Sequence, residues 1–180
     1  MKVEVVAHNP KWQSEFEAES VLVAAALGET AVAIHHIGST SIPGIYAKPV
    51  IDMLVEVTAI DEVDGRGSAM KSLGYEVMGE FGIHGRRYFR KDDNRGRRTR
   101  QIHAFGVGSD HVIRHLAFRD YMRAHPQDAQ LYSDLKSKLA ARHPEDPDAY
   151  MDGKDLFIME IDRRAAIWFK SLRTSIHSPT

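Results

Sequence analysis

The sequence predicts an α+β protein in which a mixed β-sheet is flanked by helices and followed by a helical C-terminal part. Apolar, β-branched runs that are typical of strands lie between residues 31 and 107. An amphipathic helical pattern precedes these runs, and only helical patterns follow residue 110. The regular alternation of strands and helices that marks a doubly wound parallel sheet is not present.

The expected elements follow one another along the chain, beginning with a short extended arm at residues 2–6. Residues 11–27 have apolar side chains at helical spacing and end at Gly28, a common helix terminator. We expect strands at residues 31–37, 50–57, 75–78, 87–91 and 101–107, and further helices at residues 60–74, 111–123, 126–139 and 154–172.

Local signals support several of these boundaries. Ser109 and Asp110 form a good N-cap pair for the helix that follows them. The polar, aperiodic residues 92–100 join two strands as a hairpin loop. In the last helix, apolar side chains at helical spacing predict a buried stripe made of Leu156, Met159, Ile161, Ala165 and Trp168.

Length and composition indicate one globular domain, which we expect at residues 1–173, with a disordered tail at residues 174–180. The net charge of −1 argues against broad, nonspecific binding to nucleic acid. The chain has no cysteine, which excludes disulfides, thiolate metal sites and a cysteine nucleophile. It shows neither a signal peptide nor an apolar run of membrane-spanning length, so we expect a cytoplasmic protein.

The loop at residues 38–44 contains two glycines, a proline and three hydroxyl side chains. Gly38, Ser39 and Thr40 offer unhindered backbone N–H groups and two hydroxyls, which are the parts of an anion-binding nest. The same residues could equally cap a helix or close a turn. The Gly-Lys-Ser/Thr ending of a Walker loop is absent.

Asp52 stands in the apolar run that follows this loop. A carboxylate there is costly to bury unless it pairs with Lys48, reaches solvent or binds a cation. Glu56 shares a strand face with Asp52, but four residues of strand separate the two by about 13 Å. Carboxylates at positions 52 and 54 would be close enough to share one metal ion, but position 54 is leucine.

Three other side chains are candidates for the same site. Pro49 holds Lys48 in an extended conformation at the mouth of the loop, where its ammonium group either contacts phosphate or is solvated. Arg87 and His103 lie on expected strands and are either phosphate and metal ligands beside Asp52 or ordinary core and surface residues. Lys136 and Lys154 look like surface lysines of helices. The sequence contains no His-Glu-x-x-His pattern, so it gives no indication of a zinc site.

The segment from His36 to Gly44, followed by Ala47-Lys48-Pro49-Val50-Ile51-Asp52-Met53-Leu54-Val55, closely resembles the signature of the GrpB-like family. Other segments that match the family are Asn9-Pro10-x-Trp12, residues 116–126, Tyr132, Leu135-Lys136, Tyr150, Lys154 and Ala166-x-Trp168. The resemblance covers residues 3–170.

This resemblance implies membership of the nucleotidyltransferase superfamily that includes DNA polymerase β. In that superfamily a Gly-Ser loop holds nucleotide phosphates, and the next strand has two alternating carboxylates for Mg²⁺ or Mn²⁺. Gly38 and Ser39 match the loop and Asp52 matches the first carboxylate, whereas Leu54 replaces the second. If the resemblance holds for the metal site, one of His103, Glu80 and Glu56 would have to supply the missing second ligand.

Two hypotheses follow. In the first, the protein binds a nucleotide or coenzyme-like small molecule with Mg²⁺ or Mn²⁺, as an enzyme that transfers a nucleotidyl group to a small molecule or protein would. Its catalytic residues would be Asp52 and Lys48, its phosphate ligands Gly38, Ser39, Thr40, Lys48 and Arg87, and its metal ligands Asp52 and His103. The alternative is a non-catalytic nucleotide-binding or regulatory module with a degenerate metal site.

Overall fold

A mixed five-stranded β-sheet forms the centre of the protein in the computed structural model, which describes residues 3–176. The strands are β1 (Ala31–Ile37), β2 (Ile51–Val57), β3 (Glu76–Val77), β4 (Arg87–Asp92) and β5 (Arg98–Gly106), in the order β1-β2-β5-β4-β3. Only the β2–β5 pair is parallel; the other three pairs are antiparallel. The predicted α+β class with a mixed sheet is confirmed.

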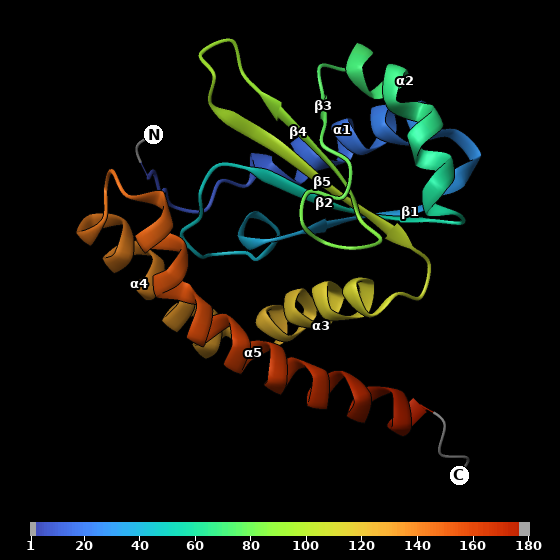
Figure 1. Cartoon of the computed structure of the whole chain (residues 1–180). Coiled ribbons are helices and arrows are strands. Elements are labelled where there is room, and N and C mark those ends of the chain that lie inside the picture. The colour runs from blue at the N-terminus through green and yellow to red at the C-terminus, as the bar shows by residue number, and fades with distance from the viewer. Residues whose placement is uncertain (1–2, 177–180) are drawn as a thin grey trace.

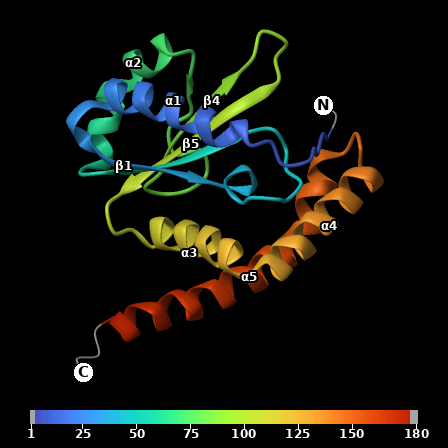
Figure 2. The ribbon, with the colours of Figure 1, turned by 180° about the vertical axis from the view of Figure 1, so that it is seen from behind.

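Helices cover both faces of this sheet (Figure 1). One face is covered by α1 (Lys11–Leu27) and α2 (Gly67–Ser72), which lie in front of the sheet in the view from behind (Figure 2). The other is covered by α3 (Asp110–Ala124), which packs in turn on α4 (Pro126–Arg142) and α5 (Pro147–Ile176). The helical C-terminal part therefore forms a layer on one side of the sheet.

Strand β2 is apolar on both sides because it is covered on both sides. Met53 and Val55 are fully buried in the core cluster beneath α1 and α2. Leu54 faces the opposite way and packs with Ile37, Phe105 and other residues beneath α3. Since side chains alternate along a strand, Asp52 lies on the α3 side, near the N-terminal end of β2.

Several element boundaries differ from the sequence-based expectation. The strand at 31–37 and the helix at 11–27 are confirmed. Residues 60–66 form a 3₁₀ helix before the short α2, which fits the glycines at 65 and 67 that weaken an α-helix. The extended arm contributes a single bridge between Val6 and Ala47. Strand β5 begins at Arg98, within the expected hairpin loop.

The predicted buried stripe of the last helix was wrong at its first two positions, because Leu156 is 82% exposed and Met159 is 66% exposed. Ile161 and Ala165 are buried as expected, and helical steps back from them lead to Lys154 and Tyr150. Because the stripe was predicted from apolar residues alone, the prediction could not include Lys154, which lies on the buried face of the helix. The helix also continues through Ile176, so only residues 177–180 of the expected tail lie outside the described residues.

In the part of the chain that the structure describes, no helix is both long and apolar enough to cross a membrane.

We expect Met53→Ala to lower the free energy of unfolding by about 2–5 kcal/mol, because Met53 is fully buried in the central strand. Chemical denaturation would measure the change. Val32→Ala, at a site that is 55% exposed on the edge strand, is the control and should change stability by no more than about 0.5 kcal/mol. Equal effects of the two substitutions would contradict the assigned core.

Candidate functional site

The loop after β1 brings backbone against the Asp52 carboxylate. Gly38 has φ of 71°, and a Cβ atom placed on it would lie 2.5 Å from Oδ2 of Asp52. Both the left-handed backbone conformation and the close approach require glycine here. A short 3₁₀ turn at Ser39–Ser41 then leads the chain away from the sheet.

Side chains from the loop and from α3 fix this turn. The Ser41 hydroxyl donates to the Gly38 carbonyl at 2.6 Å. The Arg123 guanidinium donates two hydrogen bonds to the Ser41 carbonyl, at 2.9 and 2.7 Å. Arg119 donates to the carbonyl of His36 at 3.2 Å. The loop is therefore a preorganised element whose carbonyls are already satisfied.

The Thr40 side chain forms hydrogen bonds with residues on either side of the loop. Its hydroxyl lies 2.9 Å from Nε2 of His36 and donates to the Val50 carbonyl at 3.1 Å, and the residue is 3% exposed. The predicted role of Thr40 as a phosphate ligand does not fit this inward position. Ser39 is only partly buried, and its side chain lies close enough to Tyr132 on α4 to influence the pKa of that tyrosine.

Asp52 is partly buried near the N-terminal end of β2. Burial raises its pKa to about 7, and the positive charges of Lys154 and Lys48 act in the opposite direction. The lysines thus lie close enough to stabilise the carboxylate, although neither forms a salt bridge with it among the described residues.

Three lysines from separate segments lie close to one another, and we call Lys48, Lys136 and Lys154 the lysine cluster. Lys48 and Lys154 are the two whose charges act on Asp52. The Nζ atoms of Lys48 and Lys154 each lie 4.5 Å from the centre of the Tyr150 ring. The Nζ atom of Lys136 lies 4.4 Å from the centre of the Tyr132 ring and donates to the Tyr46 carbonyl. Both rings thus hold ammonium groups by cation–π contact.

Burial and mutual repulsion outweigh the effect of the carboxylates of Asp52 and Asp155 on the lysine cluster. Burial lowers the pKa of all three lysines, to about 7 for Lys136 and about 8 for Lys154. The next largest cause is repulsion, of Lys136 by Lys154 and of Lys154 by Lys48. Within residues 3–176, none of the three forms a salt bridge. An anion bound beside them would relieve this repulsion.

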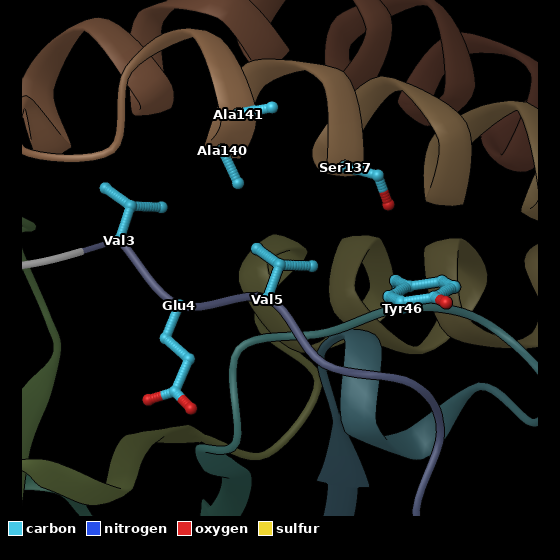
Figure 3. A pocket seen from close by; sticks show the side chains of 7 residues that line it. All are labelled: Val3, Glu4, Val5, Tyr46, Ser137, Ala140 and Ala141. Carbon is cyan, nitrogen blue, oxygen red and sulfur yellow. The ribbon is translucent and has the colours of Figure 1, made fainter.

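Two pockets lie on either side of the N-terminal arm. One, of about 300 Å³, opens next to the cluster and is lined by Glu4, Lys48, Pro49, Val50, Asp93, Arg97, Arg98 and Thr99. The other, of about 500 Å³, lies between the arm and α4 and is lined by Val3, Glu4, Val5, Tyr46, Ser137, Ala140 and Ala141. Val3 and Val5 point toward α4, whereas Glu4 points away from it (Figure 3). The pocket beside Lys48 is the more basic one.

Arg87 does not reach this site. It occupies the α1 and α2 side of β4, together with buried Phe89, and donates to both carboxylate oxygens of Asp64 at 2.6 and 2.8 Å. Alternation along β4 places Arg87 on the opposite face of the sheet from Asp52. Its predicted role as a phosphate ligand therefore does not fit the structure.

His103 lies on the same face as Asp52 but has other neighbours. Its Nδ1 atom is 3.4 Å from Nη1 of Arg86, and its ring lies between those of Tyr88 and His115. Burial, with the charges of His115 and Arg86, lowers its pKa to about 3. A guanidinium facing the ring nitrogen is a poor setting for a metal ligand.

The sequence matches the family described as GrpB protein over residues 2–164. This chain belongs to the GrpB family. The crystal structure of conserved protein GrpB from Enterococcus faecalis has 41% identity and a TM-score of 0.88, over 92% of this chain and 99% of that one. Glutamate-rich protein GrpB of Alkalihalophilus pseudofirmus is 34% identical over 163 residues, which are 89% of this chain and 94% of that protein.

One other relative is about twice as long as the matched segment, and one solved structure has much lower sequence identity. UPF0157 protein YqkA of Bacillus subtilis is 46% identical over 94% of this chain, and the chain spans 49% of the length of YqkA. Crystal structures of Cid1 poly(U) polymerase match at 8% identity with a TM-score of 0.46, over 73% of this chain and 45% of Cid1. No function follows from a similarity this low.

The residues present do not fit a magnesium ion. The position on β2 where a second carboxylate would stand beside Asp52 is Leu54, which is fully buried in the cluster with Ile37 and Phe105. Glu56 is engaged with His35 at 2.8 Å, and Glu80 accepts from the Gly85 N–H at 2.7 Å. Among the described residues, no group of three histidine, cysteine, aspartate or glutamate side chains could hold a metal ion.

Sequence reasoning missed the two residues that α4 and α5 bring to the site, Lys136 and Lys154. Both were expected to be surface lysines, but they are 2% and 8% exposed. The sequence contained a signal: Tyr132 precedes Lys136 by four residues, and Tyr150 precedes Lys154 by four. On a helix, such pairs lie on one face, so each tyrosine can accompany its lysine into the protein.

We expect Gly38→Ala to cost more stability than Gly44→Ala. Both residues have positive φ, 71° and 80°, so both substitutions strain the backbone. Only Gly38 adds a clash with Asp52, since nothing lies within 4 Å of a Cβ at Gly44. Thermal and chemical unfolding of the two variants would measure the difference, and equal losses would disprove the close contact.

Lys136→Met should stabilise the free protein in a pH-dependent manner. Lys136 is protonated below about 10.5 in the unfolded chain but only below about 7 in the folded one, so its contribution to stability falls as pH drops through this range. The variant should gain about 2–4 kcal/mol over the wild type at pH 7 and below, and little near pH 10. Urea titrations at several pH values would measure this gain, and a gain independent of pH would contradict the buried lysine.

Proposed function

We propose that this protein binds a phosphorylated small molecule, such as a nucleotide or a coenzyme-like compound, with its phosphates at the lysine cluster. One observation supports this most directly: three lysines from different segments lie together on the rings of Tyr132 and Tyr150, and none of them forms a salt bridge within the described residues. Keeping ammonium groups partly or fully buried destabilises the free protein. A phosphate group supplies the missing negative charge and acceptor oxygens.

The binding groups have distinct roles in this proposal. Lys48 and Lys154 neutralise phosphate charge, while Ser39 contributes a hydroxyl and backbone N–H from the loop. Lys136 is held by the Tyr46 carbonyl and adds positive potential from behind. The adjacent pocket, at about 300 Å³ and bordered by Arg97 and Arg98, accommodates the rest of the molecule.

Transfer of a nucleotidyl group to a small molecule or protein is a second candidate, favoured by Asp52. A carboxyl group whose pKa is raised to about 7 is suited to general base catalysis near neutral pH. Asp52 would accept the proton of the acceptor's hydroxyl group. The hydroxyl oxygen would bond to the α-phosphorus of a nucleoside triphosphate as the bond from that phosphorus to pyrophosphate breaks. Release of pyrophosphate from a nucleoside triphosphate would be the assay.

The binding proposal is tested by calorimetric titration with ATP, coenzyme A and inorganic pyrophosphate. Lys154→Gln should weaken the affinity about tenfold or more, because a hydrogen bond to a charged group contributes about 1.5–3 kcal/mol. Lys138→Gln removes an exposed lysine from the same helical layer and should leave the affinity unchanged. Absence of binding by all three compounds would overturn the proposal.

A further inference from the structure

We infer that the site binds phosphate without a divalent cation, because the ammonium groups of Lys48 and Lys154 take the place of a metal ion beside Asp52. The inference rests on the proposed phosphate-binding function and specifies its chemistry. It also reverses the expectation, drawn from the family resemblance, that Asp52 holds Mg²⁺ or Mn²⁺.

Strand β2 offers no second carboxylate beside Asp52. Mg²⁺ requires near-octahedral oxygen coordination and is held by one or two carboxylates together with substrate phosphates and water. The position for a second carboxylate on β2 is Leu54, which is fully buried in the cluster beneath α3. An acidic side chain there would be placed in an apolar core, so the missing ligand is a built-in feature of the packing.

The two ammonium groups already supply the charge that a metal ion would bring. Lys48 and Lys154 approach the same Tyr150 ring, each at 4.5 Å from its centre, and together they bear two positive charges. Of all the charges that act on Asp52, theirs are the ones that stabilise its carboxylate. A divalent ion added at Asp52 would be repelled by both.

The positions of these charges are fixed before any ligand arrives. Lys154 is 8% exposed on α5, and Lys48 comes directly before Pro49. The Gly38 backbone closes one side of the carboxylate, where a single added carbon would lie 2.5 Å from Oδ2. Preorganised charges of this kind bind an anion with little rearrangement. Asp52 then serves to hold the two ammonium groups together.

The decisive test compares pyrophosphate binding by calorimetry in excess EDTA and in excess Mg²⁺. We expect affinity in EDTA at least equal to that in Mg²⁺, and a loss of about tenfold or more for Lys154→Gln that Mg²⁺ does not restore. Asp52→Asn should retain or increase affinity, because it removes a negative charge near the phosphate. Lys138→Gln is the matched control.

The possible failures are distinguishable. Binding that occurs only with Mg²⁺, and is abolished in Asp52→Asn, overturns the inference and leaves the proposed function standing. No binding in either condition overturns both. If Lys154→Gln does not fold, as judged by circular dichroism, Lys48→Gln at the less buried site provides the same comparison. Unchanged affinity in Lys48→Gln would then reject the lysine role.

Discussion

The contact between the Gly38 backbone and the Asp52 carboxylate is the constraint on which the site depends. It exists because β1 and β2 are antiparallel neighbours in which Ile37 pairs with Asp52, so the chain turns directly over the carboxylate. Arginines of α3 fix the turn from the other side by binding its carbonyls. The loop therefore joins the sheet to the helical layer, and both must be folded before the site exists.

The lysine cluster shows how a binding site can be maintained at a cost to stability. Its members are held by tyrosine rings and by one backbone carbonyl, and burial makes their protonated forms unfavourable. Free proteins tolerate such groups when a bound partner compensates for them. The same reasoning gives Asp52 a role in a mostly apolar strand: its negative charge offsets the nearby ammonium groups in the absence of ligand.

The absence of a second carboxylate has a structural explanation as well. Leu54 belongs to an apolar cluster that joins β1, β2 and β5 to α3, and this cluster fixes the helix over the sheet. The packing of α3 and the loss of a metal ligand are thus two consequences of the same residue. A site of this kind differs in chemistry from a two-carboxylate metal site even where the surrounding loop is similar.

The sequence by itself determined the α+β class, the helix at 11–27 and the strand at 31–37, and it selected Gly38 and Asp52 as candidate site residues. These features rest on local periodicity and on residue types that are unusual in their positions. Tertiary structure alone decided that Arg87 faces away from Asp52, that Thr40 points inward, and that Lys136 and Lys154 are buried, Lys154 with its charge close to Asp52. Strand order and helix packing bring together residues some 100 positions apart, and no local pattern contains that information.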